Sequence, residues 1–174
     1  MAPPASTAAV RAYWNARIHD LEVSRHTPGS REFFADLDEY HFDKLHHLLR
    51  LVPFETSRGR SVLEVGCGAG TDLVRFARHG AHATGVDLAE SAIALARANF
   101  AQQGLHARLL VADGEALPFA EGAFDIVYAH GVVQYTADDR ALVAEARRVV
   151  KPGGLVIFQV YNRISWLNAL SKVM

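Results

Sequence analysis

A glycine-rich loop is the feature of this 174-residue sequence whose residue types and spacing most clearly predict chemistry. Gly66, Gly68 and Gly70 alternate with other residues directly after a short apolar run at 61–65. Glycine lets a backbone turn sharply and approach a ligand closely, and a helix that begins after such a loop offers unpaired N–H groups. The loop therefore predicts a binding site for a nucleotide-type ligand.

The spacing of the glycines separates two such ligands. A dinucleotide loop reads G-x-G-x-x-G or -A, but here the third small position, counted from Gly66, is Thr71. Glu64 precedes the loop, and Asp87 follows about 20 residues later, where a carboxylate binds ribose hydroxyls. The pattern disfavours a nicotinamide cofactor, and an NAD-dependent dehydrogenase remains as an alternative.

Alternating strands and helices must position this loop. Apolar runs predict strands at 61–65, 83–87, 107–111, 124–128 and 155–160. Helical patterns follow at 73–78, 90–103 and 138–150, the second closed by Gly104. Apolar strands that alternate with helices form a parallel sheet, and right-handed crossovers place helices on both faces. We therefore expect an α/β fold with a doubly wound, mostly parallel, Rossmann-like sheet.

The first 55 residues carry two further helical patterns, at 8–19 and 33–51. They predict an N-terminal helical cap at 1–55, in front of a nucleotide-binding domain at 56–174. Tyr13 and Trp14, together with Tyr135, either line a substrate pocket or belong to the core.

The cap also contains three histidines close together, His41, His46 and His47. They lack the i, i+4 spacing that places two metal ligands on one helix face. We interpret them as a solvated side of the helix, and we predict no metal site.

Composition excludes several classes of partner. The net charge is −1, so no basic excess favours nucleic acid or a membrane surface. The sequence shows no secretory signal and no apolar run long enough to span a bilayer. Its single cysteine, Cys67, fits a reducing compartment. We expect a cytoplasmic protein whose partner is a small molecule, with neither nucleic acid nor membrane, and we leave the oligomeric state open.

Five segments in order resemble class I S-adenosylmethionine-dependent methyltransferases. Residues 62–71, Val-Leu-Glu-Val-Gly-Cys-Gly-Ala-Gly-Thr, are similar to the family's first motif, hhE/DxGxGxG. The other similar segments are Val86-Asp87-Leu88, the loop 112–119, the fourth strand with its continuation at 124–136, and 142–155 with its Lys-Pro-Gly-Gly turn. The resemblance extends over roughly residues 60 to 161, and it implies S-adenosylmethionine as the cofactor and a strand order of 3-2-1-4-5.

The resemblance also implies the roles of individual residues. The backbone of the glycine loop would face the amino-acid end of the cofactor, with Cys67 as filler and Glu64 helping to position the ligand. The remaining contacts would be Asp87 with the ribose hydroxyls, Leu88 with the adenine ring, Asp113 with the adenine amino group, and Gly114 through its backbone.

His130 follows the fourth predicted strand, where the resemblance implies that the methyl group lies. Methyl transfer from a sulfonium is an in-line displacement, and the protein mainly holds the nucleophile and the methyl group together. A general base is needed only when the acceptor must first lose a proton, and imidazole titrates in the right range. His130 is therefore the candidate catalytic residue; alternatively, it only lines the pocket or hydrogen-bonds the cofactor.

Missing motifs narrow the acceptor. The [N/D]-P-P-[F/Y] motif of amino-methylating DNA enzymes is absent at 129–132. Cytosine C5 methyltransferases place a nucleophilic cysteine in the same region, whereas the only thiol here lies in the glycine loop. Asp125 lies at the start of its strand, whereas catechol-type enzymes bind Mg²⁺ at the end. What remains resembles methyltransferases of quinone, sterol and natural-product pathways. We predict an enzyme that methylates a small organic acceptor, with a non-catalytic S-adenosylmethionine-binding module as the alternative.

The family's sheet normally ends in an antiparallel hairpin beyond the fifth strand. Only residues 161–174 follow that strand here, enough for one helix. We expect the hairpin to be missing, the fifth strand to form an exposed edge, and the chain to be a fragment of a longer protein.

Overall fold

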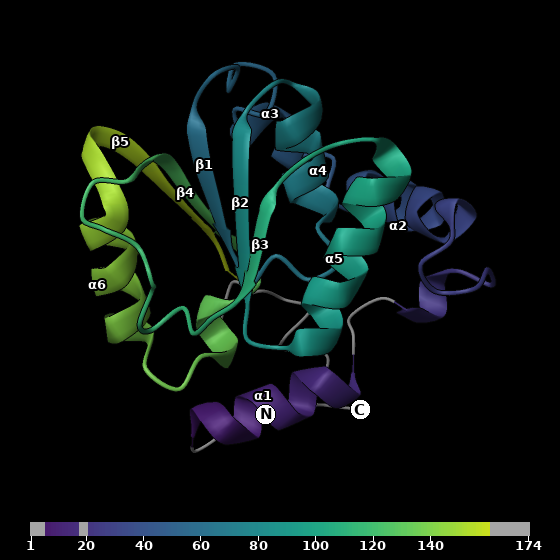
Figure 1. The fold of residues 1–174 in the computed structure, drawn as a ribbon, viewed down its shortest axis with the longest axis horizontal. Helices are drawn as coiled ribbons and strands as arrows, with labels where there is room; N and C mark the ends of the chain where they lie inside the picture. The colour runs from purple at the N-terminus through teal and green to yellow at the C-terminus, as the bar shows by residue number, and fades with distance from the viewer. Residues whose placement is uncertain (1–5, 18–20, 161–174) are drawn as a thin grey trace, which may run out of the picture.

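A five-stranded parallel sheet forms the centre of the computed structural model, which describes residues 6–17 and 21–160 (Figure 1). The strands run in the order β3-β2-β1-β4-β5. Their bounds are β1 Ser61–Val65, β2 His82–Asp87, β3 Arg108–Val111, β4 Phe124–His130 and β5 Val150–Gln159. The predicted fold class and strand order are confirmed. The helix predicted within 161–174 lies outside the described residues.

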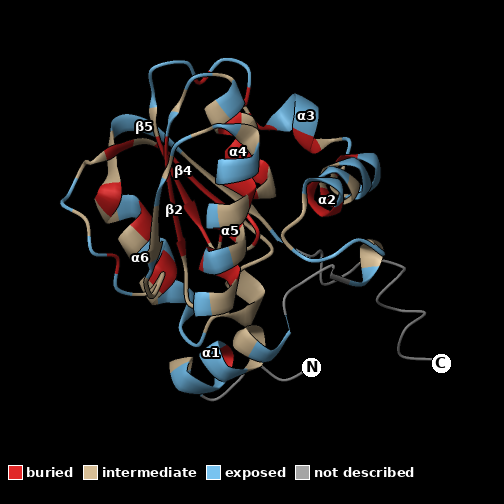
Figure 2. Cartoon of the chain, turned by 45° about the vertical axis from the view of Figure 1, so that its right-hand side comes forward, coloured by how far each residue is buried: buried red, intermediate tan, exposed pale blue. Residues whose placement is uncertain are grey.

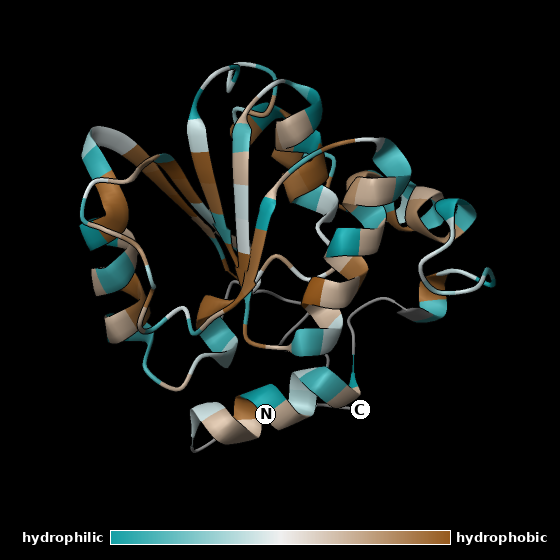
Figure 3. Ribbon diagram, in the orientation of Figure 1, coloured by the Kyte–Doolittle hydropathy of each residue, from teal (hydrophilic) through white to brown (hydrophobic). Residues whose placement is uncertain are grey.

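Helices cover both faces of the sheet. α4 (Thr71–Arg78) and α5 (Glu90–Gln103) pack on one face, and α6 (Asp139–Val149) packs on the other. The central strands β1, β2 and β4 are mostly buried, whereas the edge strands β3 and β5 are half-buried to exposed (Figure 2). Figure 3 shows polar residues on the outer faces of the helices. No helix of the described part is both long and apolar enough to cross a bilayer.

β5 begins earlier than predicted, directly after α6, and contains Pro152 and Gly153. Its pairing with β4 shifts register between Phe124 and Ile126. Proline is tolerated where a strand is irregular or lies at an edge. β5 has this position, because β4 is its only neighbour in the described sheet.

The N-terminal cap contains α1 (Thr7–Ala16), a 3₁₀ turn (Leu21–Val23), α2 (Arg31–Lys44) and α3 (Leu48–Leu51). The prediction of one helix over 33–51 is wrong, because the chain turns between α2 and α3. On a continuous helix, Phe42 and Leu48 would point in directions about 120° apart. The turn allows both side chains to enter one core cluster with Phe54 and Phe76.

α1 crosses beneath the carboxyl ends of the strands in Figure 1, and Asn15 fixes it there. The Ser91 backbone N–H donates to Asn15 Oδ1 at 3.2 Å, and Asn15 Nδ2 donates to Glu90 Oε2 at 2.6 Å. Ala89, at the N-cap of α5, makes no side-chain capping bond. Asn15 therefore satisfies a donor that α5 would otherwise leave free in its first turn.

Candidate active site

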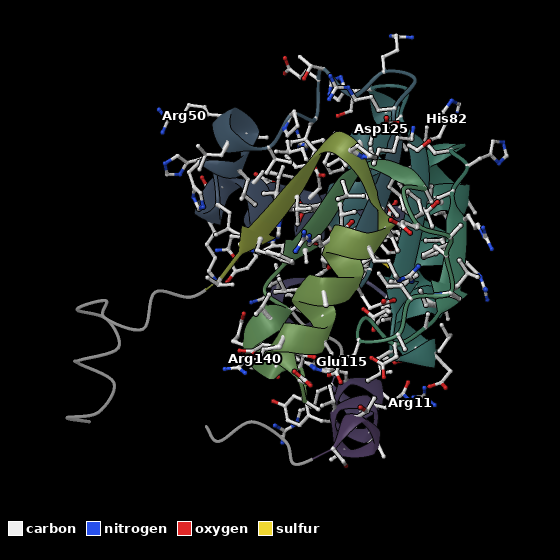
Figure 4. All side chains as sticks on the ribbon, turned by 90° about the vertical axis from the view of Figure 1, so that its left-hand side faces the viewer. Arg11, Arg50, His82, Glu115, Asp125 and Arg140 are labelled. Atoms are coloured by element: carbon white, nitrogen blue, oxygen red, sulfur yellow. The ribbon has the colours of Figure 1, made fainter. Side chains whose placement is uncertain are left out.

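A cavity of about 340 Å³ opens where the carboxyl ends of β1, β2 and β4 meet the cap. The strand order reverses beside β1, and ligands of doubly wound sheets bind in the crevice at such a point. The volume lies within the range of small-molecule sites, about 300–1,000 Å³. In Figure 4, Glu115 marks this end of the molecule near Arg11 of α1, while His82 and Asp125 lie at the opposite end.

Nearly all the residues predicted to bind a cofactor meet in this cavity. Its lining includes Glu64, Gly66, Cys67, Gly68, Asp87, Leu88, Asp113, Gly114 and His130. Gly70 does not line it. Gly70 has a φ of 78° at the N-cap of α4, and a Cβ there would lie 3.4 Å from Ala96 and Phe100. This glycine permits α4 and α5 to pack closely.

The glycine loop is held against β2. The backbone N–H groups of Gly66 and Cys67 both donate to the carbonyl oxygen of Val86, at 2.8 and 3.0 Å. Gly66 has a φ of 70°, and a Cβ on it would collide with Val132 Cγ2, whereas a Cβ on Gly68 would meet no atom within 4 Å. Gly66 is therefore required by close packing, and Gly68 leaves space.

Cys67 is buried within the loop. Burial, together with the negative charges of Glu64 and Asp87, raises the pKa of its thiol well above the usual value. The residue therefore stays a neutral thiol, which agrees with its interpretation as filler rather than nucleophile.

Asp87 joins the loop to the start of α5. Its Oδ2 accepts from the Gly68 N–H and its Oδ1 from the Ala89 N–H, both at 2.9 Å. Burial raises the pKa of this carboxyl despite these hydrogen bonds. Each oxygen retains a second lone pair, so the carboxylate can still accept from a ligand.

Glu64 places an unsatisfied acceptor in the cavity wall. The residue is 3 % exposed, and its Oε2 has no hydrogen-bond partner in the described part of the chain. Burial, followed by the charges of Asp72 and Asp87, raises the pKa of this carboxyl well above its ordinary range. A cationic donor on a ligand would satisfy the free oxygen and favour the ionised form.

Asp72 gathers three donors beside the glycine loop. His41 Nε2 lies 3.0 Å from Asp72 Oδ1, and His130 Nδ1 lies 3.1 Å from Oδ2. The Tyr128 hydroxyl donates to the same Oδ2 at 3.1 Å. Burial opposes ionisation, but the hydrogen bonds and charges of the two histidines outweigh it and hold the pKa of Asp72 well below its usual range.

The interpretation of His41 as part of a solvated helix side is wrong, although it holds for His46, which is exposed. The His41 side chain is only 17 % exposed. His41 follows Phe33 and Leu37 at intervals of four residues, so it continues the buried face of α2. This spacing was the signal that could have revealed it.

Asp72 was not predicted either. Its signal was a carboxylate in the first turn after the glycine loop, where a helix N-terminus favours negative charge. The ligand-type atoms of His41, Asp72 and His130 lie within 4.8 Å of one another, a grouping that could also hold a metal ion. The absence of a metal remains a prediction.

Two of the three candidate aromatic residues line the cavity. Trp14 and Tyr135 pack edge to face with ring centroids 5.3 Å apart. Tyr13 contacts Trp14 from outside the lining, at 5.1 Å. α1 and the turn after β4 thus close the cavity with an aromatic pair.

The sheet order, the glycine loop and the cavity define an α/β protein that binds a nucleotide-like ligand. A family model described as "Methyltransferase domain" matches residues 63–158. The chain belongs to this methyltransferase family, which confirms the predicted family and S-adenosylmethionine as the cofactor. The match also argues against the dehydrogenase alternative.

Curated relatives agree with this assignment. A protein named "Ubiquinone biosynthesis O-methyltransferase" from Sodalis glossinidius is 36 % identical over 144 residues, covering 76 % of this chain and 57 % of the relative. A protein of the same name from Maricaulis maris is 39 % identical over 123 residues, covering 70 % and 47 %. The chain spans about half the length of these relatives.

Solved structures agree on the fold. The YcgJ protein of Bacillus subtilis superposes with a TM-score of 0.61 at 29 % identity, covering 65 % of this chain and 50 % of the other. A geranyl diphosphate C-methyltransferase from Streptomyces coelicolor gives a TM-score of 0.71, covering 98 % and 73 %. At 20 % identity, the second structure shows the fold alone.

Proposed function

We propose that this chain transfers a methyl group from S-adenosylmethionine to a hydroxyl oxygen of a small organic acceptor. The observation that carries the proposal is the buried Oε2 of Glu64, which has no hydrogen-bond partner among the described residues and lies in the wall of a glycine-lined cavity at the switch point of the sheet. S-adenosylmethionine supplies a methyl group activated by a sulfonium, together with an ammonium group that can pair with such a carboxylate.

The remaining cofactor contacts follow from the positions of the lining residues. Gly66 and Gly68 line the part of the cavity that would receive the amino-acid end of the cofactor, and Asp87 keeps lone pairs for the ribose hydroxyls. Leu88, Asp113 and Gly114 form the wall that would receive the adenine. The described part of the N-terminal cap contributes α1 and α2 to the rest of the enclosure, and we expect the cap to select the acceptor.

Two observations support oxygen as the methylated atom. The relatives quoted above are named O-methyltransferases. A hydroxyl must lose its proton before or during methyl transfer, and His130 supplies an imidazole at the cavity for that purpose. Trp14 and Tyr135 give the acceptor an aromatic surface, which suits a planar ring.

Calorimetry and turnover test the proposal separately. The full chain should bind S-adenosylmethionine and S-adenosylhomocysteine with one-to-one stoichiometry, and failure to bind either would refute it. Transfer of a labelled methyl group to members of a panel of hydroxylated aromatic compounds should follow, whereas their matched O-methyl ethers should remain inert. Tight cofactor binding without transfer to any acceptor would instead support the non-catalytic binding module.

The cellular setting is also part of the proposal. A net charge of −1 gives no electrostatic support for a nucleic-acid partner, and the buried thiol of Cys67 is compatible with a reducing cytoplasm. We therefore propose a cytoplasmic protein that does not bind nucleic acid. Fractionation of the native protein tests its location, and a gel-retardation assay with duplex DNA and RNA at low salt tests whether it binds either nucleic acid.

A further inference from the structure

We propose that Asp72 and His41 are positioning residues that hold His130 ready to accept the proton of the acceptor hydroxyl. Asp72 fixes the tautomer of His130, and His41 connects this arrangement to the N-terminal cap. The inference rests on the proposed function, because it assumes that a hydroxyl is methylated. The three residues come from three separate elements, α2, α4 and β4.

The ionised state of Asp72 determines which ring nitrogens carry protons. A carboxylate can only accept hydrogen bonds, so the nitrogen that faces it must be a donor. His130 faces Asp72 Oδ2 through Nδ1, at 3.1 Å. Neutral His130 therefore carries its proton on Nδ1, and Nε2 keeps a lone pair. Since His130 lines the cavity, that lone pair is available to a ligand there.

The carboxylate is held by more than one donor. The Asp72 side chain is only 4 % exposed, and a buried charge is stable only when its oxygens are paired. Tyr128 donates to Oδ2, and burial together with the Asp72 charge raises the pKa of its hydroxyl, so it remains a donor. His41 supplies the bond to Oδ1 that neither of the other two residues can make.

His41 makes the arrangement depend on the cap. Its ring centroid lies 5.1 Å from that of His130, and its Nε2 lies 3.0 Å from Asp72. The Asp72 carboxylate can compensate an imidazolium, so a proton accepted by His130 is stabilised through Oδ2 while His41 pairs with Oδ1. Because His41 belongs to α2, the carboxylate is fully paired only when the cap is docked.

Other charged and titratable groups face the same cavity and must stay constant in a test. Apart from the cluster itself, they come from the strand ends, the glycine loop, the loop after β3, the turn after β4 and the cap: Glu64, Cys67, Asp87, Asp113, Glu115, Tyr135, Arg17, Tyr40 and Lys44. Isosteric changes within the cluster leave all of them in place. Differences between such variants therefore report on Asp72 or His41.

The proton step itself is balanced within the site. The O–H bond of the acceptor breaks and an N–H bond forms at His130 Nε2. The oxygen keeps the electron pair with which it then attacks the methyl carbon, and the carbon–sulfur bond breaks with its electron pair left on sulfur, so that a neutral thioether leaves. His130 becomes an imidazolium whose positive charge is compensated by the Asp72 carboxylate, and the proton is afterwards released to solvent.

Nitrogen NMR of the histidine rings tests the tautomer without requiring any turnover. We expect His130 to be protonated at Nδ1 and unprotonated at Nε2 in the neutral ring, as assigned by its loss in His130→Gln. In Asp72→Asn this preference should disappear, whereas the exposed control His46→Gln should leave it unchanged. A neutral His130 that carries its proton on Nε2 in the unaltered chain would overturn the proposal.

Kinetics test the consequence. We expect Asp72→Asn to lower kcat by about 10²-fold or more, with cofactor affinity nearly unchanged, because the base loses its correct tautomer. The acid limb of the pH–rate profile should move to lower pH, since loss of the carboxylate disfavours the imidazolium. His41→Gln should act in the same direction by a smaller factor, with His46→Gln unaffected. An unchanged kcat and profile in Asp72→Asn would refute the assignment.

Failure of the proposed function and binding of a metal can each be told apart from failure of the positioning role. If the unaltered chain binds cofactor but methylates no hydroxyl compound, the proposed function fails while the NMR result still decides the tautomer. A zinc titration followed by calorimetry examines the metal alternative. Stoichiometric binding that is abolished in both His41→Gln and His130→Gln would show that the cluster is a metal site, and would overturn the positioning role.

Discussion

The two ends of β4 present acidic residues in opposite settings. At its start, Asp125 pairs with Lys151 Nζ at 2.8 Å and accepts from the Ser61 N–H, with about a third of its side chain exposed. Beyond its other end, Asp72 is buried and pairs with His130 and His41. The pKa of both carboxyls is lowered, Asp125 mainly by its hydrogen bond to Lys151 and Asp72 by its histidines against the effect of burial.

The contrast separates a solvated ion pair from a buried one. Asp125 could be lost at little cost, because water replaces its partners. Asp72, Glu64 and Asp87 are carboxyls with shifted pKa values in the wall of the cavity, and such groups are candidates for binding a ligand or taking part in a reaction.

The largest expected difference between the two ends is in stability. Asp72→Asn should lower the free energy of unfolding by about 3 kcal/mol at neutral pH, because it breaks a buried charged cluster. Asp125→Asn should cost about 1 kcal/mol or less. Urea denaturation of both variants measures the difference. Equal losses would show that burial of Asp72 has no energetic consequence.

The pH dependence of the Asp72 contribution has a definite sign. Its pKa in the folded chain lies below the ordinary value of 3.8, so the contribution is present above about pH 4 and is lost as pH falls towards the folded pKa. The gap between the unaltered chain and Asp72→Asn should therefore narrow on acidification below pH 4. A gap that widens there would contradict the assignment.

A second comparison uses two glycines that have nearly the same backbone φ angle. Gly59, before β1, has a φ of 73°, and Gly66, after β1, has a φ of 70°. Alanine at either site bears a left-handed strain of about 1–2 kcal/mol. Only at Gly66 would the new Cβ meet Val132, which adds about 1–3 kcal/mol.

Cofactor titration distinguishes the two alanine variants more sharply. Gly66→Ala should lose most of its cofactor affinity, and Gly59→Ala should bind normally once its lower stability is taken into account. If both bind equally well, the close approach at Gly66 does not shape the cofactor site.

The smallest effect is expected for Glu64→Gln, which should lower cofactor affinity but raise the stability of the ligand-free chain. Cofactor affinity should fall by about 1.5 kcal/mol, because a charge-assisted hydrogen bond is lost. Stability of the ligand-free chain should rise at pH above 4.5, because the raised pKa of Glu64 makes its ionisation unfavourable in the folded state. Asp125→Asn serves as the control, with no change in affinity. An unchanged cofactor affinity would refute the ligand role of Glu64, and a loss of stability would contradict the unfavourable ionisation of its buried carboxyl.

Sequence reasoning located the sheet and the cofactor loop well, because both depend on local signals. Ser61–Val65 and Glu90–Gln103 begin and end where their patterns predicted. The turn between α2 and α3 was missed, because it is imposed by packing of Phe42 and Leu48 into a distant core. The cluster around Asp72 was missed for a similar reason, since its residues are 31 and 58 positions apart in the chain.

The pairing of β1 with β4 has a consequence for how the chain reaches its native state. Val62 aligns with Ile126, so pairing of these two strands requires closure of a long segment of chain. Parallel pairings of this kind form slowly, because chain entropy is lost before the contacts are gained. Recovery of cofactor binding should therefore belong to the last refolding phase, after most helical signal has returned.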